Sequence, residues 1–238
     1  MTTNPSIWAL VPAAGTGARM QSAVPKQYLP LLDRPVLQHT LECLCAHAQV
    51  RGVLVGISAD DAHWRDLAAK LAPLTKLLGT FAGGATRAQT VLNGLHLLQG
   101  RAQADDWVMV HDAVRPCLRA SDLDRLIAAV KDHADGGLLA LPVSDTVKRA
   151  DETTRVVETV PRANLWRALT PQMFRLGKLR HALERALAEG ADVTDEAAAI
   201  EAAGGRPMLV AGHPDNIKIT VPEDLPLAEL FLRQQRRV

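Results

Sequence analysis

Small and cationic residues cluster near the start of the 238-residue chain, in the segment PAAGTGAR at residues 12–19. After a strand, such a segment lets backbone N–H groups approach a phosphate closely. The segment matches neither the Walker A pattern nor G-x-G-x-x-G, because no Gly-Lys-Ser/Thr follows Gly15 and Met20 stands where a third glycine would be. Arg19 and Lys26 add two positive charges, which suit a polyphosphate. Taken by itself, the segment is equally compatible with a plain turn.

Two further motifs combine glycine, cationic and acidic residues. GGATRAQTV at residues 83–91 has a glycine pair, which lets the backbone approach a flat ligand, before a predicted helix. A strand-to-helix turn is its simpler interpretation. VHDAVRP at residues 110–116 puts Asp112 at the end of an apolar run, where a carboxylate is well placed to hold Mg²⁺ together with phosphate oxygens or, alternatively, to cap a turn. The sequence has no His-x-x-His or His–Cys spacing, so it does not predict a zinc site.

Two charged segments lie later in the chain. DNIKIT at residues 215–220 combines Asp215 and Lys218 at the edge of a predicted strand. Arg162 follows a polar region, so the position of its side chain depends on where that region docks. Each motif is a weak indication when taken alone, whereas their joint order along the chain is specific.

These motifs lie between short apolar runs and amphipathic stretches. Apolar runs predict strands at residues 7–11, 53–57, 77–81, 107–110, 138–143, 208–210 and 217–220. Apolar residues at helical spacing predict helices at residues 35–48, 61–71, 86–98, 122–130, 177–189, 195–203 and 222–233. The alternation of strand and helix indicates an α/β fold around a mostly parallel sheet. Ligands of such sheets bind outside the carboxyl ends of the strands.

The region at residues 144–161 interrupts this alternation. It is polar and alternating, and it predicts a two-stranded hairpin around residues 151–154. Its faces carry few large apolar residues, and an isolated hairpin is only marginally stable in water. We therefore expect either the parent domain or a second subunit to cover it.

The composition limits the class of protein. Lys and Arg total 27 and Asp and Glu total 26, so the formal net charge is +1. With one Tyr, three Phe and four Trp, the chain lacks the basic charge and the stacking aromatics that nucleic-acid binding usually recruits. Its 238 residues, 47% of them hydrophobic, suffice for a sizeable core. We expect one domain over residues 1–238, with the insertion at about 144–161.

The sequence predicts neither a membrane protein nor a secreted one. No run approaches the ~18 apolar residues of a membrane helix, and the start MTTNPS has no basic region and no long apolar core. The chain has three cysteines, Cys43, Cys45 and Cys117, which is an odd number and leaves at least one without a disulfide partner. Their spacing does not match a metal site, so they are typical of buried thiols in a reducing cytosol. We expect a cytoplasmic protein with no membrane partner.

The order and spacing of the motifs resemble those of the 2-C-methyl-D-erythritol 4-phosphate cytidylyltransferases, within the glycosyltransferase-A-like nucleotidyltransferases. The resemblance covers nearly the whole chain, from the loop at 13–29 through GGxxR, HDAxRP, the DTVK of the hairpin region, LWxALTPQ and TDEA at 194–197 to DNIKxT before PED at 222–224. It implies a Rossmann-like, mostly parallel sheet with flanking helices, of the nucleotide-diphospho-sugar transferase type, plus a β-hairpin dimerisation arm. It also implies transfer of CMP from CTP to the polyol phosphate, with release of pyrophosphate, in non-mevalonate isoprenoid biosynthesis.

The resemblance also implies roles for individual residues. Catalysis would depend on four cations, Arg19, Lys26, Arg162 and Lys218. CTP would be bound by Pro12, Ala13, Ala14, Gly15, Thr16, Gly17, Gly84, Ala85, Arg87, Thr90, Asp112 and Ala113. The polyol phosphate would be bound by Arg115, Thr146, Arg162, Thr170 and Lys218, and Mg²⁺ or another divalent cation by Asp112 and Asp215. The arm would embrace a second copy in a homodimer, so that Thr146 and Arg162 complete the site of that copy.

Three other functions compete with this interpretation. A cytidylyltransferase acting on ribitol 5-phosphate would share the same motifs. A dinucleotide-binding oxidoreductase would use the turn at Gly15 and Gly17, although Met20 and the cationic loop argue against it. A non-catalytic CTP-binding module is disfavoured because Arg19 and Lys26 occur together with Asp112.

Overall fold

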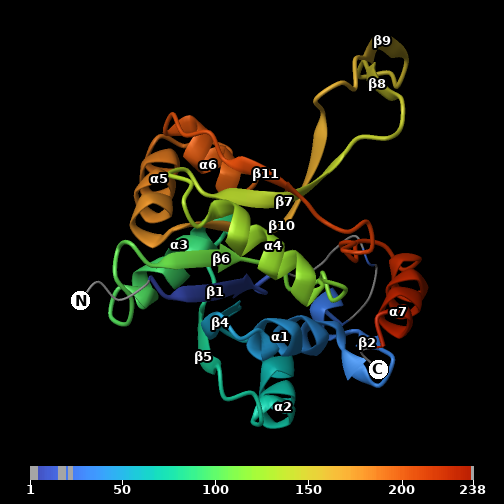
Figure 1. The fold of residues 1–238 in the computed structure, drawn as a ribbon. Coiled ribbons are helices and arrows are strands. Elements are labelled where there is room, and N and C mark those ends of the chain that lie inside the picture. Colours follow the sequence, from blue (N-terminus) through green and yellow to red (C-terminus); the bar gives the residue numbers. More distant parts are fainter. Residues whose placement is uncertain (1–4, 16–19, 21–23, 237–238) are drawn as a thin grey trace.

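A seven-stranded sheet forms the centre of the molecule in the computed structural model (Figure 1). The structure describes residues 5–236 except 16–19 and 21–23. The strand order is β11-β7-β10-β6-β1-β4-β5. Strand β10 runs antiparallel to its neighbours β6 and β7, and the other neighbouring pairs are parallel, so the mostly parallel sheet is confirmed. The strands span Ile7–Pro12 (β1), Val50–Ile57 (β4), Leu77–Ala82 (β5), Trp107–Val110 (β6), Gly137–Pro142 (β7), Trp166–Arg175 (β10) and Met208–Ala211 (β11).

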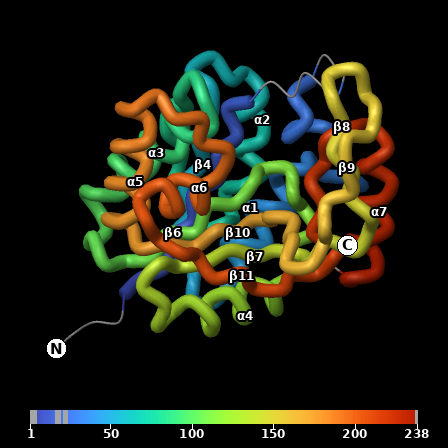
Figure 2. The backbone as a smooth tube through the Cα atoms, turned by 90° about the horizontal axis from the view of Figure 1, so that it is seen from above, coloured from blue at the N-terminus to red at the C-terminus, as the bar shows by residue number. Residues whose placement is uncertain are grey.

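Helices cover both faces of this sheet, as the view from above in Figure 2 shows. Because side chains alternate along a strand, Ala9 and Val11 of β1 face one layer and Trp8 and Leu10 the other. Such a strand is apolar on both sides, which is why its sequence is an uninterrupted apolar run. The first layer holds α1 (Val36–Ala46), α2 (Ala62–Leu71) and α4 (Ala120–Val130), and the second α3 (Arg87–Leu98), α5 (Leu176–Ala188) and α6 (Glu196–Ala202).

A third apolar cluster joins the C-terminal helix α7 (Asp224–Gln234) to the segment that precedes α1. That segment contains the short helix η2 (Lys26–Tyr28) and the two-residue strands β2 (Pro30–Leu31) and β3 (Arg34–Pro35). With α7, every predicted helix is confirmed at closely similar bounds. Within the described residues, none of the helices is both long enough and apolar enough to span a bilayer.

The hairpin predicted in residues 144–161 is also confirmed. Strands β8 (Val147–Ala150) and β9 (Val156–Val160) pair antiparallel, and the Asp151 carboxylate accepts the N–H groups of Thr153 at 2.8 Å and Arg155 at 3.0 Å, which closes the turn. We call residues 144–161 the arm. Figure 1 shows it projecting away from the sheet. Val156 and Val157 are 64% and 61% exposed, so the described part of this chain leaves these two apolar side chains uncovered.

Strand β10 was not predicted from the sequence. A proline within a run normally argues against a strand, and β10 contains Pro171. The strand tolerates it because the pairing with β7 is irregular between Ala168 and Gln172. The local pattern therefore concealed a strand that the neighbouring β6 and β7 hold in place.

The prediction of a strand at residues 217–220 is wrong. These residues form no strand, although the Ile219 N–H donates to the Val114 carbonyl at 2.9 Å. The apolar alternation has another cause, because the fully buried Ile219 packs in the third cluster with Val114 and Leu232 of α7. Burial against a helix produced the pattern that resembled a strand.

Candidate active site

Loops at the carboxyl ends of β1, β5 and β6 enclose a cavity of about 250 Å³, which we call the first cavity. Neighbouring parallel strands end at the same sheet edge, so segments distant in sequence meet there. The first cavity is lined by Pro12, Ala13, Ala14 and Gly15 after β1, by Gly84, Ala85, Thr86, Arg87 and Thr90 around the start of α3, by Asp112, Ala113 and Val114 after β6, and by Lys26, Gln27 and Lys218.

Two glycines allow the loop before α3 to pack tightly. A Cβ on Gly83 would lie 2.4 Å from the Ala14 Cβ, and one on Gly84 would lie 2.3 Å from the Gln89 side chain. The Thr90 hydroxyl accepts the Gly84 N–H at 3.0 Å and donates to the Thr86 carbonyl at 2.9 Å. Thr90 thus uses its hydroxyl to shape the glycine loop.

The short helix η2 supplies a cation and a clamp to the first cavity. The Gln27 side-chain amide donates to the carbonyls of Ala13 at 2.8 Å and Gly15 at 3.1 Å, which fixes the chain as it leaves β1. The Lys26 ammonium donates to the Ile219 carbonyl at 3.1 Å, next to Lys218. Lys26 and Lys218, which come from opposite ends of the chain, therefore line one cavity.

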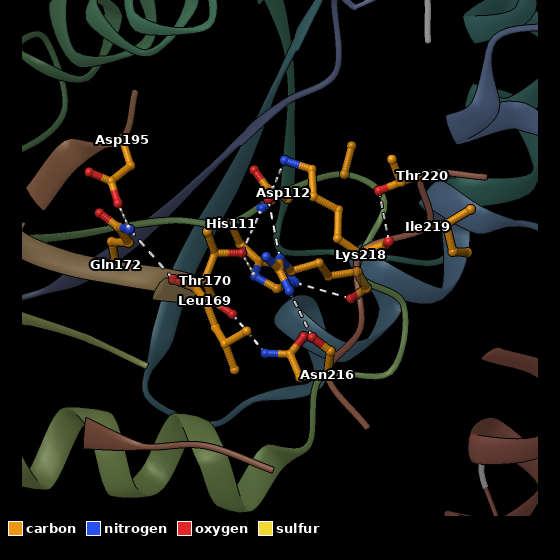
Figure 3. Close-up of polar contacts among 12 residues, drawn as sticks. His111, Asp112, Leu169, Thr170, Gln172, Asp195, Asn216, Lys218, Ile219 and Thr220 are labelled. Carbon is orange, nitrogen blue, oxygen red and sulfur yellow. Dashed lines mark hydrogen bonds and ion pairs between the residues drawn. The ribbon is translucent and has the colours of Figure 1, made fainter. Parts of the chain in front are cut away.

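Asp112 holds three cations at the edge of this cavity. Its Oδ1 accepts from Arg87 Nε at 3.2 Å, and its Oδ2 contacts Arg115 Nε at 3.2 Å and Lys218 Nζ at 3.0 Å. Figure 3 shows the Lys218 side chain reaching toward Asp112. Burial alone would raise the pKa of Asp112, but the charges of Arg87, Lys218 and Arg115 outweigh it and hold the pKa below its usual range. The carboxylate stays ionised.

The buried His111 is linked to Asp112 through the Thr170 hydroxyl. The Arg115 carbonyl can only accept, so Nε2 of His111 carries the ring proton and donates to that carbonyl at 3.2 Å. Nδ1 of the neutral ring therefore accepts from the Thr170 hydroxyl at 2.9 Å (Figure 3), and that hydroxyl accepts the Asp112 N–H at 3.1 Å. Burial lowers the pKa of His111 to about 4, so the ring is neutral at neutral pH.

A second cavity of about 200 Å³ adjoins the first. Arg87, Asp112 and Lys218 line both cavities, and we call these three residues the shared wall. A ligand in either cavity therefore meets the same charged groups. The other residues of the second cavity are Arg115, Ala168, Leu169, Thr170, Gln172, Thr194 and Asp195.

Three of the predicted site residues line neither of these two cavities. Thr146 lies in the arm, and the exposed Arg162, which directly follows the arm, donates from its guanidinium to the Ser144 carbonyl. Asp215 is buried, and its Oδ2 accepts from the Arg119 guanidinium and, at 2.9 Å, from the Gln235 amide. The role of Asp215 as a metal ligand together with Asp112 stays a prediction.

The other predicted residues fall into two groups. Thr16, Gly17 and Arg19 lie outside the described residues, so their roles stay predictions. The remaining predicted residues each line the first cavity, the second cavity or both.

Sequence reasoning assigned no role to four residues that shape the site, Gln27, Gln172, Asp195 and Glu196. Gln172, Asp195 and Glu196 belong to the segments TPQ and TDEA, which carried the resemblance, so a signal was present. Glu196 is 1% exposed and contacts Arg87. A charged residue that is fully buried could not be recognised from the sequence, because burial depends on the docking of α6.

Comparison with known proteins shows the family to which the chain belongs. The family model described as 2-C-methyl-D-erythritol 4-phosphate cytidylyltransferase (IspD) matches residues 7–234. A protein of that name from Azoarcus sp. (strain BH72) is 52% identical over 240 residues, covering 99% of this chain and 98% of the relative. One from Hahella chejuensis is 49% identical over 228 residues, covering 96% of this chain and 93% of the relative.

Solved structures show the same similarity. The crystal structure of 4-diphosphocytidyl-2C-methyl-D-erythritol synthase has a TM-score of 0.83 and 38% identity, and the match covers 97% of this chain and all of the other. The crystal structure of 2-C-methyl-D-erythritol 4-phosphate cytidylyltransferase from Francisella tularensis has a TM-score of 0.80 and 34% identity, covering 95% of this chain and all of the other.

Proposed function

Because the chain belongs to the 2-C-methyl-D-erythritol 4-phosphate cytidylyltransferase family, we infer that it transfers CMP from CTP to 2-C-methyl-D-erythritol 4-phosphate and releases pyrophosphate. The protein is thus a nucleotidyltransferase of isoprenoid precursor biosynthesis. The observation that carries this inference is the pair of adjoining cavities joined by the shared wall. Two anionic reactants must meet in this enzyme, and the shared wall supplies charge where they would meet.

We assign CTP to the first cavity and the polyol phosphate to the second. Small residues and exposed backbone around the two loops of the first cavity suit a flat base and a triphosphate. Arg115 in the second cavity suits a phosphate, and Gln172, Thr194 and Asp195 offer polar partners for hydroxyl groups. The Thr90 hydroxyl already bonds the loop, so cytosine would be recognised chiefly by that loop's backbone.

The reaction needs charge stabilisation and no general base. The acceptor phosphate is already an anion at neutral pH, and its oxygen attacks the α-phosphorus of CTP. A new P–O bond forms as the bond to the bridging oxygen breaks, and the electron pair leaves with pyrophosphate. Two unit charges at ~4 Å repel by about 1 kcal/mol in water and ~4 kcal/mol at an effective dielectric of 20. Lys26 and Lys218 offset this repulsion and stabilise the charge of the transition state.

Magnesium, or another divalent cation, would be held by Asp112 and the phosphates of CTP. Among the described residues, no three His, Cys, Asp or Glu side chains are grouped as a metal site. The donor set nevertheless fits, because Mg²⁺ is commonly bound through one or two carboxylates plus substrate phosphates. When bound, the ion would neutralise phosphate charge and orient the triphosphate. Asp112 would then exchange part of its contact with Arg87, Arg115 and Lys218 for the metal.

The arm supports the proposal of a homodimer. Val156 and Val157 present apolar surface that the described part of this chain does not cover. A second copy would cover this surface, and Thr146 and Arg162 would then reach the second cavity of that copy. The cytoplasmic location stays a prediction.

The decisive experiment measures pyrophosphate release from CTP and Mg²⁺ with each acceptor separately. We expect turnover with 2-C-methyl-D-erythritol 4-phosphate to exceed turnover with ribitol 5-phosphate by at least about tenfold, the effect of one well-placed polar contact. Excess EDTA should abolish turnover, and added Mg²⁺ should restore it. Equal or greater turnover with ribitol 5-phosphate would overturn the acceptor assignment, and turnover in EDTA would overturn the metal requirement.

A further inference from the structure

Glu196 is a buried carboxylate that the proposed reaction does not use. It lies in the first turn of α6, in the segment TDEA, and is 1% exposed. Both of its oxygens are occupied by one guanidinium, because Arg87 Nη1 donates to Oε1 at 2.6 Å and Nη2 donates to Oε2 at 3.1 Å. This two-point contact fixes the plane of the guanidinium.

The same guanidinium contacts Asp112 within the shared wall. The third nitrogen of Arg87, Nε, donates to Asp112 Oδ1 at 3.2 Å, while Asp112 Oδ2 contacts Lys218 at 3.0 Å. Glu196 is thereby connected through Arg87 to the carboxylate that Lys218 contacts. Burial alone would lower the pKa of Arg87, but Glu196 and Asp112 outweigh it and raise the pKa, so the guanidinium stays charged.

Helix α6 is anchored so that Glu196 has one position. The Gln172 amide, 1% exposed in β10, donates to Asp195 Oδ2 at 2.9 Å and accepts the Ala197 N–H at 2.8 Å. Asp195 itself caps the helix by accepting the Ala198 N–H at 2.9 Å. Figure 3 shows Gln172 reaching Asp195 from the strand. The residues on either side of Glu196 are therefore held against the sheet.

We propose that Glu196 is a positioning residue for the transfer reaction, acting through Arg87 on the shared wall. Glu196 accepts from both terminal nitrogens of Arg87 and so orients the guanidinium with Nε toward Asp112. Without Glu196, those nitrogens would pair with Asp112 in competition with Lys218, or with a phosphate in an unproductive geometry. This inference rests on the proposed function, because it assumes that both substrates meet at the shared wall.

The substitution Glu196→Gln removes the charge and keeps the shape. It turns one acceptor oxygen into an amide that faces the Arg87 donors, so the guanidinium loses its two-point partner. We expect kcat to fall by about 10- to 100-fold, as for a small displacement of a catalytic group. The KM for CTP should change by less than about threefold, because the lost contact involves no substrate. Glu201→Gln is the matched control, since Glu201 is an exposed residue of the same helix.

A double-mutant cycle separates positioning from a general loss of structure. If Glu196 acts through Arg87, then Glu196→Gln in an Arg87→Met background should lower kcat by less than about threefold further. Independent structural damage would instead multiply the two losses. Active enzyme is counted by titration with radiolabelled CTP, so that a smaller folded fraction does not resemble a lower kcat.

The outcomes of this experiment are distinct. Wild-type kcat in Glu196→Gln, or multiplicative losses in the double variant, would overturn the positioning role. If Glu196→Gln fails to fold, Glu196→Asp keeps the charge and shortens the reach, and it must lower kcat without changing the KM for CTP. Failure of the wild type and of Glu201→Gln to release pyrophosphate would instead refute the proposed function.

Discussion

Arg87 of the shared wall and Arg149 of the arm each pair with a glutamate, and the surroundings of the two pairs differ. Arg87 and Glu196 are 2.6 Å apart, with side chains 29% and 1% exposed. Arg149 and Glu158 in the arm are also 2.6 Å apart, with side chains 64% and 52% exposed. Water solvates either partner in the arm if the other is lost, whereas a buried partner has no substitute. The loss of one partner therefore costs more stability in the buried pair than in the exposed pair, although both pairs have the same separation.

The largest effect should come from breaking the buried pair. Arg87→Met leaves Glu196 without its partner and should lower the free energy of unfolding by about 3–5 kcal/mol. Arg149→Met in the arm should lower it by less than about 1 kcal/mol, because water replaces the contact. Urea denaturation of both variants at pH 7 measures the difference. Similar values for the two variants would refute the contrast between the regions.

Removal of Lys26 extends the comparison from stability to catalysis. Lys26→Ala deletes a cation from the first cavity and should lower kcat by about 10²–10³-fold, as for other electrostatic donors at a transition state. Lys70→Ala, an exposed lysine of α2, serves as control and should leave kcat unchanged. Steady-state rates of pyrophosphate release decide the matter, and a wild-type kcat in Lys26→Ala would remove Lys26 from the mechanism.

The buried His111 next to the shared wall should make the free energy of unfolding depend on pH, whereas the arm has no histidine. The pKa of His111 is lowered from 6.5 to about 4, so the unfolded chain binds a proton at pH 5 that the folded chain does not. The contribution of His111 to the free energy of unfolding is therefore fully present above pH 6.5 and is lost as the pH falls toward 4. The loss amounts to about 2 kcal/mol between pH 7 and pH 5. His111→Gln should flatten this slope in urea denaturation series. An unchanged slope would contradict the assignment.

The smallest effect should come from the predicted contribution of Arg162, which directly follows the arm, to substrate binding. Arg162→Ala should raise the KM for the polyol phosphate by about tenfold, the value of one charge-assisted contact, and leave CTP affinity unchanged. Initial rates over a range of acceptor concentrations measure the KM, and calorimetry measures CTP affinity. An unchanged acceptor KM would exclude Arg162 from substrate binding.

Local sequence patterns predicted most of the fold. The period of apolar residues located every α-helix of the described residues, although not the short helix η2. Local sequence also sets the start of a helix, since the Thr86 side chain caps α3 by accepting the Gln89 N–H at 3.1 Å. Apolar runs located the strands that are buried on both faces. Strand β10 was missed because Pro171 contradicts the local rule, and residues 217–220 were misassigned because burial against α7 imitates a strand pattern.

The motifs by themselves determined which residue types gather at the sheet edge, because a strand of a parallel sheet presents its following loop at a fixed end. Only the tertiary structure decided how those residues pair. Arg87 and Glu196 are 109 positions apart, and Asp112 and Thr170 are 58 apart. Such partners depend on the docking of α6 and β10 against the loops, and docking is a property of the whole core rather than of any local segment. Asp215 likewise pairs with Arg119, the residue before α4, while Asp112 contacts Lys218 in the shared wall.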